Sequence, residues 1–175
     1  MSGKKKLLLH CCCAPCTCGV LDRLDDYEPT LCFINPNIDT AEEYYKRAAE
    51  LERLSALTLH APVIIPPYDP APFYAAVKGL EDEPEGGRRC DACIRLRLAQ
   101  AAEYAKAFDA VTTTLTVSPH KNAPRINAIG AEITDKWVDA DFKKKDGFKH
   151  SVTRSREMGL YRQRYCGCVF SKRDE

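Results

Sequence analysis

The stretch Lys6-Leu7-Leu8-Leu9-His10-Cys11-Cys12-Cys13-Ala14-Pro15-Cys16 joins a short apolar run to four closely spaced cysteines. The apolar run Leu7–Leu9 predicts a buried β-strand, and the thiols follow it directly. In open α/β sheets, ligands bind outside the carboxyl ends of the strands. We therefore expect this group of thiols at the ligand-binding edge of such a sheet.

Cysteine is abundant along the rest of the chain as well. Ten of the 175 residues are cysteine, and two further pairs stand out, Cys90-x-x-Cys93 and Cys166-Gly167-Cys168. A disulfide framework is disfavoured, because the apolar run after the basic residues 4–6 is too short for a secretory signal. No stretch reaches the ~20 apolar residues that cross a bilayer. We expect a cytoplasmic protein without membrane contact, whose reduced thiols bind metal, carry redox chemistry, or do both.

Strand and helix patterns alternate along the sequence. A capping pattern at Thr40–Glu43 begins a helix that continues to Leu57. The pattern predicts one α/β domain over residues 1–175, with a parallel sheet and flanking helices. The predicted strands are Lys6–Cys11, Thr30–Ile34, Val63–Ile65, Ala110–Leu115 and Lys136–Asp141, and the other predicted helices are Phe73–Leu80 and one with Ile94, Leu98, Ala101, Ala105 and Phe108 on one face.

This topology predicts a common place for most of the cysteines. Cys11–Cys16 follow the first strand, Cys90 and Cys93 begin the helix before the fourth strand, and Ser118–Lys121 follow that strand. Loops at the carboxyl end of a parallel sheet meet in one crevice. The pattern does not place Cys166-Gly167-Cys168.

Charge is unevenly distributed. The formal net charge is +1, but residues 136–175 hold eleven Lys and Arg against six Asp and Glu, interleaved with aromatic residues. Cations that hold phosphates and rings that stack on bases are typical of RNA recognition. A solvated helix face with a few core aromatic residues is the alternative interpretation.

Two kinds of metal centre fit the thiols. Zinc commonly takes four thiolates from two C-x-x-C pairs, such as Cys13/Cys16 and Cys90/Cys93. That choice leaves the remaining cysteines unexplained, whereas an iron–sulfur cluster with a second metal or a dithiol would use them. The radical S-adenosylmethionine spacing C-x-x-x-C-x-x-C is absent, and no Gly/Ser-rich phosphate loop follows the first strand.

Several ordered motifs cover nearly the whole chain, from Leu7 to Ser171. They are HCCCAPC at 10–16, EGGRRCDACIRLRL at 85–98, TTLTVSPHKN at 113–122, DFKKKDGF at 141–148, Ser151, and GLYRQRYCGC at 159–168. In these motifs the sequence resembles the cobalamin-independent epoxyqueuosine reductases of the queuosine tRNA-modification pathway.

The resemblance implies a fold like that of the adenine-nucleotide hydrolases (HUP-like), in which cysteines replace the nucleotide loop. It implies a 4Fe–4S cluster, a neighbouring mononuclear metal ion, expected to be iron, and reduction of the epoxide on the modified wobble guanine of tRNA. The electron donor is unidentified. By resemblance, Cys12, Cys13, Cys90 and Cys93 bind the cofactor, Cys12, Cys13, Cys16, Cys90 and Cys93 are the metal ligands, and Cys166 and Cys168 complete the family set.

The remaining residues are assigned from the chemistry of an epoxide reduction, and each proton-donor candidate also has a structural alternative. Cys166 and Cys168 are expected to act in catalysis, as ligands or as a dithiol, with Asp91, Lys121 or Tyr165 as proton donors. Asp91 could instead cap a helix, Lys121 hold a phosphate and Tyr165 pack in the core. His10 is expected to be a hydrogen-bonded core histidine, and Cys11, Cys18 and Cys32 to be bystanders.

For the RNA we expect contacts from Lys143, Lys144, Lys145, Phe148 and Arg154, with the anticodon stem-loop as the bound part. The alternative functions are a zinc-binding RNA-interaction protein and an iron–sulfur-dependent tRNA sulfur transferase.

Overall fold

The computed structural model describes residues 3–172, so the ends of the predicted domain, residues 1–2 and 173–175, lie outside the described residues. Its four strands form one parallel sheet in the order β3-β2-β1-β4. The strands are β1 (Lys5–His10), β2 (Tyr27–Cys32), β3 (Val63–Ile64) and β4 (Ala110–Thr113). The predicted α/β class with a parallel sheet is confirmed.

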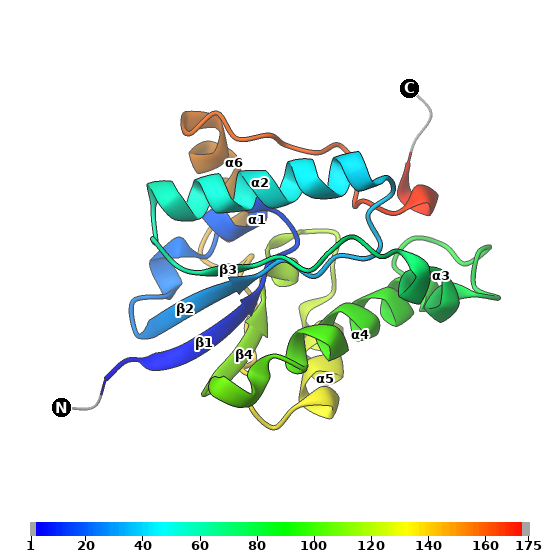
Figure 1. Cartoon of the computed structure of the whole chain (residues 1–175), viewed down its shortest axis with the longest axis horizontal. Helices are drawn as coiled ribbons and strands as arrows, with labels where there is room; N and C mark the ends of the chain where they lie inside the picture. Colours follow the sequence, from blue (N-terminus) through cyan, green and yellow to red (C-terminus); the bar gives the residue numbers. More distant parts are fainter. Residues whose placement is uncertain (1–2, 173–175) are drawn as a thin grey trace.

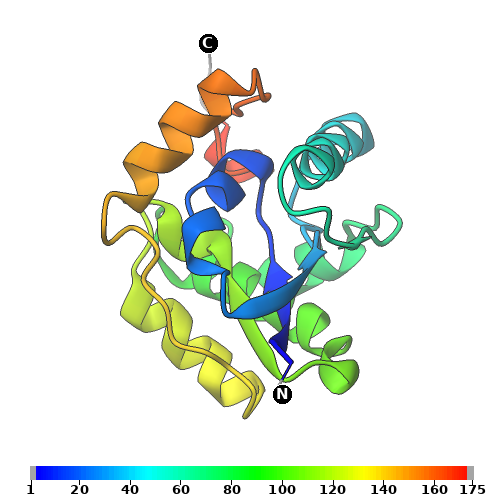
Figure 2. The same ribbon diagram turned by 90° about the vertical axis from the view of Figure 1, so that its left-hand side faces the viewer.

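Helices cover both faces of this sheet (Figure 1). On one face lie α1 (Ala14–Cys18), α2 (Ala41–Leu57) and α6 (Gly147–Glu157), and on the other lie α4 (Arg88–Ala102) and α5 (Ala123–Ile133). The end-on view of Figure 2 shows α2 and α6 above the strands and α5 below them. The short helix α3 (Ala71–Val77) packs against α4 beyond the carboxyl ends of the strands.

Side chains of β1 alternate between two cores, as expected for a strand buried on both faces. Leu7 and Leu9 pack in the same cluster as Leu51 of α2. Leu8 packs on the opposite side, in the same cluster as Ala101 of α4. The central strand is thus fixed from both sides, and so is the position of the cysteines that follow it.

Two helix starts show how the sequence sets the ends of these elements. The Thr40 hydroxyl accepts a hydrogen bond from the Glu43 amide at 3.2 Å, which confirms the predicted start of α2. The Glu43 carboxylate turns instead to Arg47, at 2.7 Å. Asn122 caps α5 through the Arg125 amide at 3.0 Å.

The predicted fifth strand Lys136–Asp141 is wrong. Within the described residues this segment pairs with β4 through a single bridge, between Val111 and Trp137. The Asn127 side chain of α5 bonds the amide and carbonyl of Ala140, which turns the segment from the sheet to the helix.

The helix predicted to include Phe108 is also shorter than expected. α4 ends at Ala102, and a separate 3-10 turn, Ala105–Ala107, leads into β4. Ala105 and Phe108 still pack beside Ala101, so the apolar pattern marked a shared core and not one continuous helix. Within residues 3–172, no helix has the length and apolar character needed to span a membrane.

Candidate metal centre at the carboxyl edge of the sheet

Three of the four cysteines after β1 form a compact group. The sulfur atoms of Cys12, Cys13 and Cys16, here called the β1 thiols, lie within 4.8 Å of one another. The Cys13 sulfur accepts the Cys16 amide at 3.4 Å and caps α1, and the Cys12 sulfur contacts the Thr114 hydroxyl at 3.4 Å. Pro15 fits the first helical turn because an amide there would have no intrahelical partner. Local sequence thus gathers three soft ligands suited to iron or zinc.

The β1 thiols act electrostatically as one group. Hydrogen bonds from Cys13 and Cys16, with help from the charge of Arg97, hold the pKa of Cys12 well below the ordinary thiol value. The hydrogen bond to Cys12 raises the pKa of Cys13 to about 12. The thiolate is the metal-binding form of cysteine, and the lowered pKa of Cys12 favours that form at this position.

The α4 thiols, Cys90 and Cys93, come from the first two turns of α4. The Gly86 amide donates to the Cys90 sulfur at 3.2 Å, and Cys93 is buried. One turn further along the helix, a guanidinium nitrogen of Arg97 lies 4.0 Å from the Cys93 sulfur. Another donates to the Asn35 side-chain oxygen at 2.7 Å.

Arg97 is a buried cation, 2% exposed, with sulfur atoms around it. Within residues 3–172 its hydrogen bonds reach Asn35 and Cys93, and no carboxylate pairs with it. Burial works to lower its pKa, but Cys93, Cys166 and Cys12 outweigh burial and raise it. An unpaired buried charge is costly, so this site suits an anionic sulfur-ligated centre.

The C-terminal thiols, Cys166 and Cys168, lie outside any helix or strand and are held by distant contacts. Arg47 of α2 donates to the Cys166 carbonyl at 3.1 Å, and the Asp39 amide donates to the Gly167 carbonyl at 2.7 Å. Gly167 has a φ of +133°, and a Cβ there would lie 3.1 Å from an Arg47 nitrogen. Glycine is therefore required between the two cysteines.

Two adjoining cavities bring all seven thiols to one edge. A larger cavity of about 330 Å³ is lined by the β1 thiols and Cys166. A smaller one of about 30 Å³ is lined by the α4 thiols and both C-terminal thiols. Arg97 and Lys121 line both cavities. The predicted meeting of the loops after β1 and β4 with the start of α4 is confirmed.

Lys121 and Asp91, both predicted proton donors, occupy different surroundings. The Lys121 ammonium lies 3.6 Å from the Cys166 sulfur. Burial works to lower its pKa, but Cys166 and other thiols raise it. Asp91 pairs with Arg125 and lines an adjoining groove between α4 and α5, which Lys121 and Cys90 also line. It does not cap α4, whose first turn follows Gly87.

Tyr165 lines the larger cavity, where the Arg47 guanidinium lies 5.0 Å from the centre of its ring. His120, Gln163 and Arg164 line the same cavity and were not singled out as site residues. The polar rim of the site is therefore broader than the sequence motifs indicate.

The other cysteines and His10 belong to the core. Burial raises the pKa of Cys32 to about 12 and that of Cys18 to about 11, and the Cys11 thiol donates to the Leu9 carbonyl. His10 bonds the Thr113 hydroxyl at 2.8 Å and the Ile34 carbonyl at 2.9 Å, and burial lowers its pKa to about 4. His10 is thus the hydrogen-bonded core histidine that we expected.

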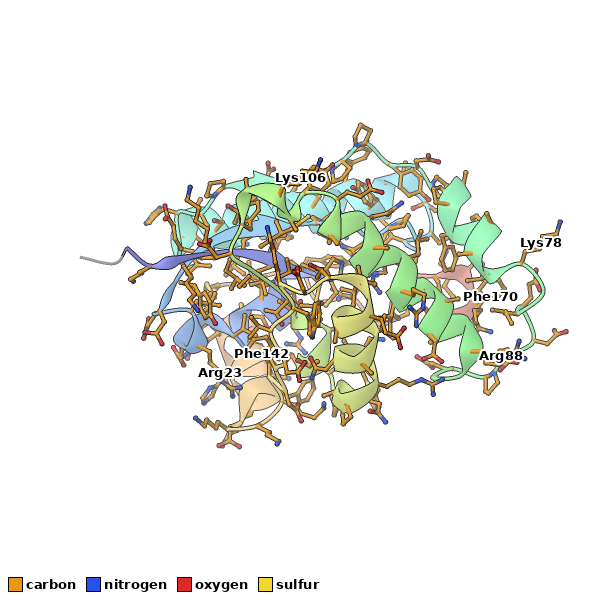
Figure 3. All side chains as sticks on the ribbon, turned by 90° about the horizontal axis from the view of Figure 1, so that it is seen from below. Arg23, Lys78, Arg88, Lys106, Phe142 and Phe170 are labelled. Atoms are coloured by element: carbon orange, nitrogen blue, oxygen red, sulfur yellow. The ribbon has the colours of Figure 1, made fainter. Side chains whose placement is uncertain are left out.

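The predicted RNA-binding residues divide into exposed and engaged side chains. Lys144, Lys145 and Phe148 are exposed. Lys143 pairs with Asp141 at 3.0 Å, and Arg154 pairs with Asp22 and donates to the Cys18 carbonyl. Phe142 is buried beside Arg23, 5.7 Å from that guanidinium (Figure 3), so part of this aromatic stretch serves the core.

Fold and site together define a class: parallel α/β proteins that carry cysteine groups suited to a metal at the carboxyl edge of the sheet. The described cysteines are all free thiols.

Comparisons with known proteins identify the family. The family model described as "Epoxyqueuosine reductase QueH" matches residues 7–174. A protein of that name from Streptococcus pyogenes serotype M1 is 38% identical over 97% of this chain and 71% of its own length. Another from Thermotoga maritima is 36% identical over 94% of this chain and 89% of its own length. The chain belongs to the QueH family of epoxyqueuosine reductases, which are oxidoreductases, and the resemblance in its motifs is confirmed.

Proposed function

We propose that this chain reduces epoxyqueuosine to queuosine at the wobble position of tRNA, with a 4Fe–4S cluster and a neighbouring iron ion held by its thiols. One observation carries the metal part of the proposal. Seven thiols from three parts of the chain line two adjoining cavities, and both cavities are also lined by Arg97, a buried cation for which the described residues provide no carboxylate partner. Family membership supports the substrate.

The donor set fits such a centre. The β1 thiols and the α4 thiols would hold the metals, since iron–sulfur clusters are bound by cysteine thiolates. When bound, the centre supplies single electrons and a Lewis acid that polarises the epoxide oxygen. The C-terminal thiols would complete the ligand set or serve as a redox dithiol beside it.

Conversion of an epoxide to an alkene consumes two electrons and two protons and releases the oxygen as water. Lys121 is the better supported proton donor, because it lines both cavities and stays protonated beside Cys166. Asp91 is the second candidate, held by Arg125 in the adjoining groove. An electron donor of unidentified nature would deliver the electrons.

The larger cavity supports an RNA substrate. Its volume of about 330 Å³ lies near the lower end of the roughly 300–1,000 Å³ typical of ligand pockets. A base must leave its stack to enter such a pocket, and a ring such as Tyr165 can receive it. Lys143, Lys144, Lys145, Phe148 and Arg154 would contact the anticodon stem-loop. Reduced thiols and a tRNA substrate both favour the cytoplasm as the place of action.

Turnover of a defined RNA tests the proposal. Anaerobically reconstituted protein should convert an anticodon stem-loop bearing epoxyqueuosine into a product that has lost one oxygen atom, measured by mass spectrometry of the digested nucleosides. Addition of sulfur with the epoxide intact would identify a sulfur transferase. RNA binding without conversion by zinc-loaded protein would favour a zinc-binding RNA-interaction protein.

A charge-matched pair of triple variants tests the RNA surface. Replacing Lys143, Lys144 and Lys145 with Ala should weaken RNA binding and flatten its salt dependence, since fewer phosphates release counterions. The control replaces Lys4, Lys5 and Lys106, which line a hollow at the amino end of the sheet. Equal salt slopes for the two variants, measured by fluorescence anisotropy, would contradict the assignment of the 143–145 lysines.

A further inference from the structure

Unpartnered buried polar atoms gather at the smaller cavity. Among residues 3–172, the buried side-chain nitrogen and oxygen atoms without a hydrogen-bond partner belong to Asn37 and Arg89 only. Both residues line the smaller cavity beside the α4 and C-terminal thiols. Neither the nitrogen nor the oxygen of the Asn37 amide is bonded, although the residue is 2% exposed. Since buried polar groups almost always have partners, the natural partner of Asn37 is what fills this cavity.

The chain around Asn37 is held firmly. Asn35, two residues earlier, donates to the Cys11 carbonyl at 3.0 Å and accepts from Arg97. Asp39, two residues later, donates its amide to the Gly167 carbonyl at 2.7 Å. A Cβ on Gly167 would lie 3.3 Å from the Asn37 side-chain nitrogen. The Asn37 amide is thus fixed against the link between the two C-terminal thiols.

Arg89 has other partners and is the weaker candidate for contact with the contents of the cavity. It donates to the carbonyls of Glu81 and Glu83, and its guanidinium lies 4.7 Å from the Phe170 ring centre. Figure 3 shows Phe170 near the start of α4, on the C-terminal segment. Only the Nε atom of Arg89 lacks a partner, whereas both polar atoms of the Asn37 side chain lack one, so Asn37 is the stronger candidate donor.

The size and lining of the cavity identify the partner. About 30 Å³ is far below the ~300 Å³ at which ligand pockets begin, so a nucleobase does not fit there. Four cysteines line this space, and about 30 Å³ has room for a single sulfur atom at the edge of a sulfur-ligated centre but not for a whole cluster. Hydrogen bonds to sulfur are among the features that set the potential of such centres, because they stabilise the more negative reduced state.

We propose that Asn37 donates an amide hydrogen bond to a sulfur atom of the metal centre beside the α4 thiols, and that this positioning residue slows metal loss and raises the reduction potential of the centre. The inference rests on the proposed function, because it requires that a metal centre occupies this edge of the sheet.

Two variants of Asn37 test the proposal with readouts other than activity. Asn37→Leu removes the donor at similar size without adding charge and is the decisive variant, whereas Asn37→Asp keeps the shape, removes the donor and adds a negative charge that lowers the potential further. For both we expect a more negative midpoint potential by redox titration with electron paramagnetic resonance. The ratio of reduced to oxidised centre at a fixed potential should fall roughly tenfold, which is about 59 mV for one electron. Iron release to a chelator should become roughly 10–100-fold faster.

In the metal-free protein, one of these variants should not be destabilised. Because Asn37 has no partner within the described chain, Asn37→Leu should leave the melting temperature of the metal-free protein unchanged or higher. Asn127→Leu is the matched control, since the Asn127 amide bonds Trp137 and Ala140 and none of these three residues lines either cavity. It should lower the melting temperature with and without metal and leave the potential unchanged.

An unchanged potential and release rate in both Asn37 variants, with lower stability of the metal-free protein, would overturn the proposal and assign Asn37 a structural role. Wild-type protein that takes up zinc and no sulfide would instead overturn the iron–sulfur part of the proposed function. In that case the rate of zinc release tests whether Asn37 donates a hydrogen bond to sulfur. Release from both Asn37 variants at the wild-type rate would contradict that hydrogen bond.

Discussion

The β1 thiols and the C-terminal thiols reach the same edge of the sheet by different means. The β1 thiols follow a strand buried on both faces, and Cys13 itself caps the short helix that comes next. The C-terminal thiols have no regular structure, and their backbone is bonded by Arg47 and by the Asp39 amide. The first group is built by its neighbours in sequence, and the second by residues more than a hundred positions away.

This difference predicts how each group responds to change. A group held by a strand and a helix cap shares the stability of the core, whereas a segment held by a few long-range hydrogen bonds can be released while the core stays folded. Substitutions in α2 should therefore disturb the C-terminal thiols selectively. Changes at the end of β1 should affect the stability of the whole fold.

The largest expected effect separates centre thiols from core thiols. Replacing any one of Cys12, Cys13, Cys16, Cys90 and Cys93 with Ala should abolish turnover, in most cases with loss of iron, because each is a predicted ligand. Cys11→Ala, Cys18→Ala and Cys32→Ala are the controls, with turnover retained and a stability cost of ~1–2 kcal/mol at these buried sites. Iron analysis and single-turnover assays of each variant measure this. An essential Cys11 with a dispensable Cys13 would mean that the ligand assignment is shifted by one residue.

Arg47→Met should displace the C-terminal thiols and leave the β1 thiols in place. The change removes the hydrogen bonds to the carbonyls of Tyr165 and Cys166 and the ion pair with Glu43 while keeping an apolar stem. We expect turnover to fall ~10–100-fold, as for other supporting residues of metal sites. Loss of a buried pair should also cost ~3–5 kcal/mol in the free energy of unfolding, measured with urea.

The matched control for Arg47→Met is Arg95→Met, since Arg95 pairs with Glu132 at the exposed surface. It should cost ~0–1 kcal/mol and leave turnover unchanged. Equal turnover in the Arg47 and Arg95 variants would show that the C-terminal thiols do not depend on α2 for their position.

Low pH should destabilise the fold through His10, at the end of β1. Burial lowers the pKa of His10 from 6.5 to about 4 in the folded chain, so below pH 6.5 the unfolded chain binds the extra proton. The contribution of neutral His10 to the free energy of unfolding is therefore fully present above pH 6.5 and is lost as the pH falls toward 4. The loss amounts to about 3 kcal/mol. Urea unfolding of the metal-free protein at pH 7 and pH 4.5 measures it.

His10→Gln should remove most of this pH dependence, and His150→Gln, at a partly exposed histidine, should retain it. Parallel losses of stability in wild type and His10→Gln between pH 7 and 4.5 would show that other groups cause the acid sensitivity.

Sequence patterns predicted the part of the site that is local. The apolar run before Cys11, the Thr40 cap and the position of Cys90 on a helix each depend on neighbours within a few residues, and each prediction is confirmed. The strand predicted over Lys136–Asp141 stops at the bridge to Val111, because the side chain of Asn127, from another element, bonds the backbone groups of Ala140 that a longer strand would pair. A β-rich pattern alone does not show such competition.

The residues that join the thiol groups were missed for a similar reason. Arg97 lies four positions after Cys93, on the apolar face of α4, so a charge on a buried face was a readable signal. Arg47 is likewise a charged residue on the buried face of a helix, between Tyr44 and Leu51 of α2. No sequence pattern indicated the position of Cys166, because that position depends on contacts between segments that are distant in the sequence.

Iron and acid-labile sulfide per chain, measured after anaerobic reconstitution, test most directly the claim that the β1 and α4 thiols together hold one metal centre. We predict brown protein that contains both iron and sulfide, bleaches on reduction, and loses metal when either the β1 or the α4 thiols are replaced. Colourless protein that holds stoichiometric zinc and no sulfide would contradict this account.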